Sequence, residues 1–371
     1  MKVTVTGAGG FIGRNLMVRL AERGVDALPV TRQTPAAEVE DALASSDLIF
    51  HLAGVNRPTD EEEFTTGNRD LTLRVGRSLA AAGRKAAMVV ASSTQAERAN
   101  AYGLSKRAAE EAALAYRAET GAPVHIFRLT NVFGKWARPN YNSAVATFCH
   151  NTARGLPITV NDPSAPLKLV YVDDVCDAFL RVLDDPEGAH GDQPGYANAG
   201  HEYQTTVGAV AATIQAFPTS RETLLTDRVG VGLTRALYAT YLSYLEPAAF
   251  AYDVARHADP RGVFVEMLKT PDCGQFSYFT AGPGVTRGQH YHHTKTEKFL
   301  VLTGRARFGF RHILTGETVH IEVDGGQGRI VETIPGWTHD ITNVGTQEMI
   351  VMLWANEIFD RDRPDTVAMK V

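Results

Sequence analysis

The sequence predicts two folds in one chain: an α/β domain with a doubly wound parallel sheet, followed by an all-β domain. Over roughly the first 180 residues, short apolar runs alternate with helical patterns, which is typical of βαβ units. After about residue 250, strand-like runs follow one another with Gly or Pro turns between them, which is typical of a sandwich or small barrel. We therefore expect domains at 1–247 and 248–371.

Length, charge and cysteine usage narrow the class of protein. A chain of 371 residues is long for one hydrophobic core, which favours two domains. With 37 basic and 42 acidic residues the net charge is −5, which gives no basic footprint for nucleic acid. The 3 cysteines are scattered and form no C-x-x-C pair, which indicates a reducing compartment. No apolar run approaches about 18 residues and a strand begins at once, so we expect a cytoplasmic enzyme without membrane association.

The first half should contain five strands with alanine-rich helices between them, such as 71–82 and 104–119. Strands separated by helices imply a parallel sheet with right-handed crossovers. Residues 205–250 also have a helical pattern. The expected strands are 2–6, 26–31, 48–52, 87–92 and 124–129.

A glycine-rich turn connects the first strand to an apolar helix. Such a turn lets the backbone approach a pyrophosphate closely, and the helix N-terminus supplies free N–H groups and the positive end of a dipole. Its place between a strand and a helix is the context that supports dinucleotide binding. The residues expected to bind the cofactor here are Gly7, Gly10, Phe11, Ile12 and Gly13.

The position that reads the ribose favours NADPH. An acidic residue about twenty positions beyond the glycine turn would accept the 2′-hydroxyl of NAD. The segment after the second strand has no carboxylate and offers Arg32 instead, which suits a 2′-phosphate. We expect NADPH as the cofactor, with Arg32 in contact with it.

A tyrosine and a lysine form the second chemical signature. Tyr102 and Lys106 are four residues apart and can share one face of a helix. A neighbouring ammonium and an oxidised nicotinamide would favour the phenolate, so that Tyr102 could exchange protons near neutral pH. Ser93, or alternatively Thr94, follows a strand and could donate a hydrogen bond to a reacting carbonyl.

In their order along the chain, these motifs resemble those of the extended short-chain dehydrogenase/reductase family, which has a Rossmann-type fold and acts on nucleotide sugars. The resemblance implies catalysis by Ser93, Tyr102 and Lys106, with the last two also touching the cofactor. It further implies cofactor contacts from Leu52, Ala53 and Gly54, and substrate contacts from Asn131 and Thr94. Only eight residues separate Ser93 from Tyr102, fewer than is usual, so the loop at the substrate entrance should be short. The matching motifs are Gly7–Gly13, His51-Leu-Ala-Gly54, Ser92-Ser93, Tyr102-x-x-x-Lys106, Arg128-x-x-Asn131-x-x-Gly134 and Tyr171-Val-Asp-Asp174.

The most informative pattern lies in the second half. Residues i and i+2 of a strand point to one face, so His290 and His292 could bind one metal ion. A turn would return Glu297 to the same place, and His339 could supply a fourth ligand. Imidazole nitrogens with a carboxylate oxygen suit zinc or another divalent first-row metal.

With their flanking glycines, these histidines resemble the motifs of the cupin superfamily. Gly284, His290, His292, Glu297 and Gly304 fit its first motif, whereas Gly336, His339 and Asn343 fit most of its second. The resemblance implies a cupin barrel that holds a metal. The base for a reaction there stays open between Tyr291, His293 and Lys298. The expected strands are 264–268, 275–280, 297–302, 306–311, 318–322 and 348–354.

The two halves together resemble a family of two-domain enzymes of capsular polysaccharide assembly. The resemblance implies a homodimer that acts on a UDP-linked 4-keto-6-deoxy amino sugar. Its cupin would invert C3 of a UDP-2-acetamido-2,6-dideoxy-4-hexulose, and its reductase would reduce the C4 ketone toward UDP-N-acetyl-L-fucosamine. One alternative is a single 4-epimerisation or dehydration with an accessory cupin. A non-catalytic NADP sensor is another, although such a sensor would not need both Tyr102 and Lys106.

Overall fold

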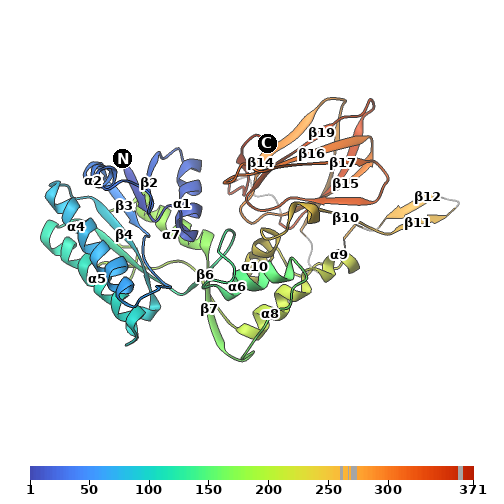
Figure 1. Ribbon diagram of the computed structural model, residues 1–371. Coiled ribbons are helices and arrows are strands. Elements are labelled where there is room, and N and C mark those ends of the chain that lie inside the picture. Colours follow the sequence, from blue (N-terminus) through green and yellow to red (C-terminus); the bar gives the residue numbers. More distant parts are fainter. Residues whose placement is uncertain (260–261, 266, 269–273, 358–361) are drawn as a thin grey trace. The chain divides into compact units, whose positions relative to one another are not determined.

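The computed structural model describes the chain except residues 260–261, 266, 269–273 and 358–361 (Figure 1). The described residues form two compact units. The first unit comprises Met1–Arg138 and Leu167–Gln204, and the second comprises Pro139–Pro166 and Thr205–Val371. The second unit thus includes helices that precede residue 247, and a boundary at that residue stays a prediction. Among the described residues, no helix is long and apolar enough to span a bilayer.

The first unit contains the expected parallel sheet, with strand order β2-β1-β3-β4-β5-β8. The chain moves from β1 to β2 on one side and then to β3 on the other, so the strand order reverses beside β1. Ligands of such sheets bind where the order reverses. The strands are β1 (Val3–Thr6), β2 (Ala27–Val30), β3 (Leu48–His51), β4 (Ala87–Ser93), β5 (Val124–Leu129) and β8 (Tyr196–Ala197).

Helices cover both faces of this sheet, because neighbouring strand residues point to opposite sides. Ile49 packs into a core with α2 (Ala36–Ser45), α4 (Leu71–Ala81) and α5 (Ala101–Thr120). Phe50 faces the other way, with its ring centroid 5.8 Å from that of Phe179 in α7 (Val172–Asp184). Helix α1 (Phe11–Glu22) packs beside α7. The doubly wound α/β prediction is confirmed for this unit.

Shorter elements complete the first unit. A second sheet has the order β6-β7-β9 and begins directly after β5. Short helical segments lie after β4 and before α4, and one of them, η1, is a π-helix. Their bounds are α3 (Glu62–Phe64), η1 (Thr65–Asp70), η2 (Thr94–Glu97), β6 (Asn131–Phe133), β7 (Pro166–Tyr171) and β9 (Glu202–Thr206).

The second unit contains two five-stranded antiparallel sheets. Aromatic side chains of the two sheets pack against each other, with the ring centroids of Phe299 and Phe308 5.7 Å apart. One sheet has the order β10 (Ala251–Asp253), β18 (Arg329–Glu332), β15 (Glu297–Thr303), β20 (Met349–Ala355) and β13 (Gln275–Ala281). The other has the order β17 (Thr318–Asp324), β16 (Arg305–His312), β19 (Trp337–Asn343), β14 (Thr286–Tyr291) and β21 (Val367–Ala368).

The all-β prediction is confirmed at the level of antiparallel sheets. Five of the six expected strands match β13, β15, β16, β17 and β20 to within two residues at each end. The sixth, 264–268, overlaps β12 (Gly262–Val265), which pairs with β11 (Arg256–Asp259). Its residue 266 lies outside the described part of the chain.

A buried ion network joins helices of the second unit to its first sheet. The Glu332 carboxylate of β18 accepts hydrogen bonds from Lys298 of β15 and from Arg221. Lys298 also donates to the Tyr252 hydroxyl at 2.7 Å. A fragment that began at residue 248 would lack Arg221 and leave part of this buried charge uncompensated, which is strongly destabilising. The helices of the second unit are α6 (Ala144–Thr152), α8 (Val207–Ala216), α9 (Thr219–Thr223), α10 (Gly232–Leu242) and η3 (Pro247–Ala249).

Candidate functional site

The glycine-rich turn lies at the switch point of the parallel sheet. Gly7 has φ 71°, and a Cβ there would lie 2.7 Å from the backbone nitrogen of Ala53. A Cβ on Gly13 would lie 2.2 Å from the carbonyl of Gly7, so helix α1 can approach the strand only with glycine at this position. Gly10 is the N-cap of α1, and Phe11 begins the helix. The turn therefore directs the N-terminus of α1 toward the edge where a pyrophosphate would bind.

The other predicted cofactor residues surround this turn. The amide of Leu52 donates to the carbonyl of Thr6, and the amide of Ala53 donates to the Thr6 hydroxyl. Gly54 lies against the Lys106 ammonium. Ile12 follows in the first turn of α1. The end of β3 is thereby fixed beside the glycine turn.

Arg32 lies in the turn that follows β2, and its side chain is exposed. The turn is stabilised by Thr34, whose hydroxyl accepts from the amide of Thr31 at 3.0 Å. The methyl group of Thr31 lies 3.8 Å from the position that a Cβ on Gly9 would occupy. Arg32 thus follows a residue that borders the glycine turn.

Alternation along β4 distinguishes the two neighbouring serines. The Ser92 hydroxyl is buried and donates to the Glu110 carboxylate at 2.5 Å. Ser93 points to the other side and lies close enough to Tyr102 to lower the pKa of its phenol. The structure therefore brings Ser93 and Tyr102 together, as the sequence predicts.

The environment of Tyr102 keeps its proton in place. Burial raises the pKa of the Tyr102 phenol, and Ser93 opposes that rise only in part. Desolvation is the physical cause of this rise, because it penalises the charged phenolate. The expectation that Lys106 and an oxidised nicotinamide together favour the phenolate stays a prediction. A protonated phenol is the form that can donate to a reacting oxygen.

Lys106 lies one helical turn farther along α5. Its ammonium donates to the carbonyl of Ala91 at 3.1 Å. Burial lowers the pKa of Lys106 to about 8, although the charge of Glu110 acts in the opposite direction. The ammonium therefore loses its proton at a pH that an enzyme assay can reach.

The short segment between Ser93 and Tyr102 contains the 3-10 helix η2. Gly103 lies against this loop, where a Cβ would be 2.3 Å from the carbonyl of Gln95. Thr94 begins η2 and is exposed. Asn131, the other expected substrate residue, is exposed at the start of β6, and its amide donates to the carbonyl of Lys168 at 2.9 Å. Both side chains are exposed to solvent, and their substrate contacts stay a prediction.

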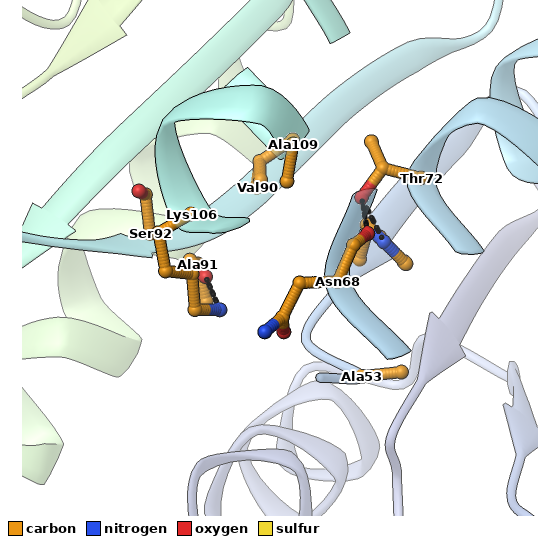
Figure 2. Close-up of a pocket in the computed structure, with 9 residues that line it drawn as sticks. Ala53, Asn68, Thr72, Val90, Ala91, Ser92, Lys106 and Ala109 are labelled. Carbon is orange, nitrogen blue, oxygen red and sulfur yellow. Dashed lines mark hydrogen bonds between the residues drawn. The ribbon is translucent and has the colours of Figure 1, made fainter. Parts of the chain in front are cut away.

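Lys106 is one of the residues that line a small cavity of about 10 Å³ (Figure 2). Asn68 lines it and bridges two segments, because its amide nitrogen donates to the carbonyl of Val55 and to the hydroxyl of Ser105. His51 also lines it, and burial followed by the charge of Lys106 lowers the pKa of His51 to about 3. A neutral imidazole can therefore lie beside the lysine. Sequence reasoning missed Asn68, which belongs to none of the motifs.

The predicted metal ligands converge in the second unit. The ligand atoms of His290, His292, Glu297 and His339 all lie within 4.8 Å of one another. One oxygen of Glu297, Oε2, is 3.3 Å from Nε2 of His292 and 3.4 Å from Nε2 of His339. A β-bulge at Gln289, which has φ 61°, brings His290 opposite His339 in the register of β14 and β19.

The donor set fits a divalent cation. Nδ1 of His292 donates to the carbonyl of Asp365, so a neutral His292 has no proton on Nε2. Two acceptors, Nε2 and the Glu297 oxygen, then face each other at 3.3 Å, which calls for a proton or a cation between them. Burial lowers the pKa of His290 to about 4, with smaller contributions from His339 and His292. Neutral imidazoles and one carboxylate are the forms that bind zinc.

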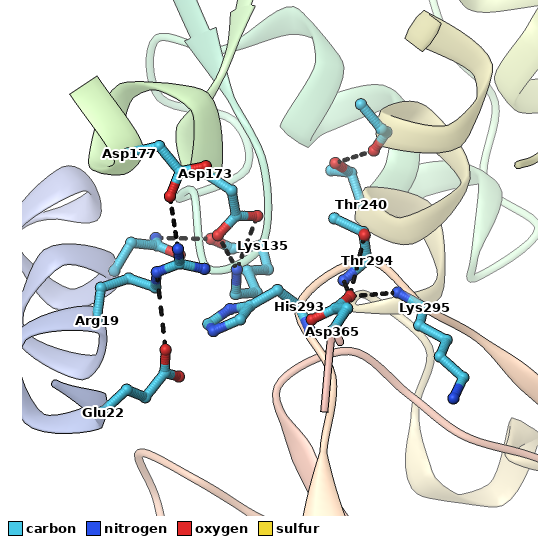
Figure 3. A network of polar contacts seen from close by, with 12 residues as sticks. Arg19, Glu22, Lys135, Asp173, Asp177, Thr240, His293, Thr294, Lys295 and Asp365 are labelled. Carbon is cyan, nitrogen blue, oxygen red and sulfur yellow. Dashed lines mark hydrogen bonds and ion pairs between the residues drawn. The ribbon is translucent and has the colours of Figure 1, made fainter. Parts of the chain in front are cut away.

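Asp365 holds the loop between these ligands, and sequence reasoning missed it (Figure 3). Its carboxylate accepts from the backbone amides of His293, Thr294 and Lys295 at 2.9, 2.6 and 2.7 Å. Burial would raise the pKa of Asp365, but the nearby imidazoles of His293 and His292 and these amides hold it well below its usual value. Partners that orient ligating histidines in this way commonly accompany metal sites.

Two of the three side chains considered as a base, Lys298 and Tyr291, have a structural explanation. The ammonium of Lys298 donates hydrogen bonds to Glu332 and Tyr252 in the buried network. Tyr291 lies between His290 and His292, two predicted ligands, and alternation at the end of β14 points it to the other face. Its ring packs against that of His293, with centroids 5.6 Å apart. Strand alternation therefore argues against a catalytic role for Tyr291.

Comparison with known proteins agrees with this two-part organisation. Residues 3–200 match the NAD dependent epimerase/dehydratase family, and residues 257–367 match a polysaccharide biosynthesis C-terminal domain. The chain is 57% identical to a UDP-2-acetamido-2,6-beta-L-arabino-hexul-4-ose reductase of Pseudomonas aeruginosa, over 100% of this chain and 99% of that protein.

Solved structures add two further relatives. The capsular polysaccharide assembling protein CapF from Staphylococcus aureus matches with a TM-score of 0.69 and 39% identity, over 100% of both chains. MoeE5, solved in complex with UDP-glucuronic acid and NAD, matches 59% of this chain and 83% of its own with a TM-score of 0.51 and 26% identity. The first family match spans more than half of the sequence, and CapF and the Pseudomonas reductase align over its full length. The chain therefore belongs to the NAD dependent epimerase/dehydratase family and shares its two-part architecture with CapF.

Proposed function

We propose that the protein is a bifunctional nucleotide-sugar enzyme. Its C-terminal, cupin-type domain epimerises C3 of a UDP-2-acetamido-2,6-dideoxy-4-hexulose, and its N-terminal domain reduces the C4 ketone with NADPH, toward UDP-N-acetyl-L-fucosamine. The observation that carries the proposal is the presence of two separate sets of groups, one in each compact unit: Ser93, Tyr102 and Lys106 in the first, and the ligand cluster in the second. The printed name of the Pseudomonas relative supports the substrate class.

The first unit holds the groups for ketone reduction. NADPH, when bound at the glycine turn, supplies the hydride that C4 receives. The Tyr102 hydroxyl, which burial keeps protonated, donates its proton to the C4 oxygen. Ser93 orients the same oxygen by hydrogen bonding. The charged Lys106 stabilises the negative charge that remains on Tyr102 after the proton has left.

The second unit holds the groups for inversion at C3. A 4-keto group acidifies the adjacent C3–H, because the electrons left behind can move onto the C4 oxygen. A divalent ion held by His290, His292, Glu297 and His339 would supply stabilisation of that negative charge. Epimerisation must precede reduction, since reduction removes the ketone on which C3 acidity depends.

A second candidate is reduction alone, with a metal that serves only the fold. The name of the Pseudomonas relative specifies a reductase and no epimerase, which favours this candidate. A four-ligand zinc shell is also typical of structural sites. The homodimer expected from the sequence stays a prediction in both cases.

Product analysis in deuterated water separates the two candidates. The full-length protein is incubated with the UDP-4-keto sugar, with and without NADPH, and the product is examined by NMR. The bifunctional enzyme incorporates deuterium at C3 without NADPH and yields a reduced, C3-inverted sugar with it. Reduction without deuterium at C3 would support the second candidate.

We predict that NADPH binds more tightly than NADH, because Arg32 follows β2 where NAD-binding proteins carry a carboxylate. Hydrogen bonds to charged groups contribute about 1.5–3 kcal/mol, so Arg32→Ala should weaken NADPH binding roughly 10- to 150-fold. NADH binding should change little. Isothermal titration of both cofactors checks this, with Arg77→Ala of an exposed α4 position as the matched control. Tighter binding of NADH by the unaltered protein would overturn the assignment.

We predict that ketone reduction slows as the pH rises through about 8, the pKa to which burial lowers Lys106. Below that pH the ammonium is charged, and above it the charge is lost. Tyr102 keeps its proton throughout, because its pKa is raised above the ordinary tyrosine value. The measurement is the rate of NADPH oxidation against pH. Lys106→Met should be slow at every pH and lack this step; an unchanged step in that variant would assign it to another group.

A further inference from the structure

The two oxygens of the Glu297 carboxylate have different partners. Oε2 faces the imidazoles of His292 and His339, at 3.3 and 3.4 Å. Oε1 lies 3.2 Å from the ammonium of Lys295, whose side chain is only 10% exposed. The carboxylate therefore presents one oxygen to the histidines while a buried cation holds the other.

The backbone of Lys295 is fixed independently of this contact. Its amide donates to Asp365, and its side chain extends away from that carboxylate (Figure 3). The neighbouring amides of His293 and Thr294 donate to Asp365 as well. The ammonium that contacts Glu297 therefore belongs to a loop, residues 293–295, that three backbone hydrogen bonds to Asp365 hold in place.

We propose that Lys295 is a positioning residue that keeps Oε1 of Glu297 occupied, so that this carboxylate offers a metal ion only its Oε2. The inference rests on the metal site of the proposed function and goes beyond it, because it assigns a role to a residue outside the ligand set. Carboxylates bind cations through one oxygen or through both. Restriction to Oε2 limits the protein to four ligand atoms, one from each of its four ligand residues.

This restriction has a chemical consequence. A fifth protein atom would occupy a position that a substrate oxygen needs, whereas catalytic metal sites keep such a position open. The charges point the same way. A divalent ion with three neutral imidazoles and one carboxylate carries a net positive charge, and the Lys295 ammonium adds another. The site so built favours the developing negative charge of a substrate oxygen.

Cobalt(II) provides a readout that does not depend on activity. The full-length protein is loaded with cobalt, and its visible absorption, which weakens as ligand atoms are added to the ion, is compared with that of Lys295→Met. We expect the variant to absorb more weakly, because Glu297 can then use both oxygens. We also expect it to bind cobalt at least as tightly, because a repelling charge has gone. Lys295→Arg, which keeps a cationic donor, should restore the original spectrum.

The outcomes separate this role from a merely structural one. Loss of an ordinary supporting hydrogen bond would weaken metal binding about 10- to 100-fold without adding a ligand atom. An unchanged spectrum in Lys295→Met would therefore overturn the proposal. Arg305→Met, at an exposed ion pair with Glu322, is the matched control. Failure of the unaltered protein to bind cobalt would instead overturn the metal site itself.

A second measurement needs no folded variant. The infrared difference between zinc-loaded and zinc-free unaltered protein reports on the carboxylate stretching bands. A carboxylate that binds through one oxygen shows a wider separation of its two bands than one that binds through both. A wide separation supports the role of Lys295, and a narrow one overturns it even if Lys295→Met does not fold.

Discussion

Replacement of Tyr102 by Phe should lower the rate of ketone reduction by about 10²–10⁴-fold, the usual contribution of a positioned proton donor. Only the hydroxyl is removed. The ring remains packed near Phe64, with centroids 5.6 Å apart, so the helix that carries Lys106 should keep its place. NADPH affinity should therefore change little. The measurements are NADPH oxidation in the presence of the UDP-4-keto sugar and isothermal titration of the cofactor.

The control for this variant is another tyrosine that loses its hydroxyl. Tyr278 is 72% exposed on β13, and Tyr278→Phe should reduce the ketone at the original rate. If Tyr102→Phe also retained the original rate, Tyr102 would not be the proton donor, and the raised pKa of its phenol would reflect burial alone. A joint loss of activity and NADPH affinity would show that the hydroxyl supports the cofactor site.

The sequence predicted those parts of the fold that depend on residues close together in the chain, such as strands and the faces of strands. The strand at 124–129 agrees with β5 to the residue, because a short run rich in Val, Ile and Phe follows the turn residues Gly121 and Pro123 and ends at a polar segment. The period of two along a strand separates His290 and His292 from Tyr291. The same period separates Ser93 from Ser92. The sequence does not show which of the two serines is buried, whereas the hydrogen bond from Ser92 to Glu110 does.

What was missed depends on contacts between distant segments. Asp365 lies 73 residues from His292, yet its carbonyl fixes the tautomer of that predicted ligand. No local pattern marks Asp365, because its role comes from where β21 returns to pair with β14. The structural role of Lys298 likewise depends on residues that are distant in the sequence. Its neighbour Glu297 is a predicted ligand, but Lys298 points to the other face, where it binds Glu332, which also binds Arg221.

The environment of a side chain is also invisible to sequence. Four-residue spacing placed Lys106 and Tyr102 one turn apart on α5, but it could not show which influence dominates the pKa of the phenol in the protein without cofactor. The spacing gives proximity, whereas the pKa follows from the balance of desolvation and charge. Burial dominates at Tyr102 and raises the pKa of the phenol. Such a balance requires coordinates.

The division of labour between the two units gives the other large effect. Full-length His290→Ala/His292→Ala should lose metal and lose deuterium incorporation at C3, by about 10²-fold or more if the ion supplies the main stabilisation of the developing negative charge. Tyr102→Phe should show the opposite behaviour, with C3 exchange intact and unreduced keto sugar accumulating. Elemental analysis measures the metal, and NMR in deuterated water measures the exchange.

Full-length variants are required because the second unit also includes residues before 248. Arg221 shares the buried Glu332 carboxylate with Lys298, so an isolated β fragment could lose exchange simply by unfolding. His320→Ala, at an exposed position of β17, is the matched control for loss of a histidine. If the double variant loses its metal but still exchanges the C3 proton at the original rate, the ion serves the fold alone. Exchange that disappears with Tyr102→Phe as well would assign both steps to the first unit, since hydride and proton transfer would then share one set of residues.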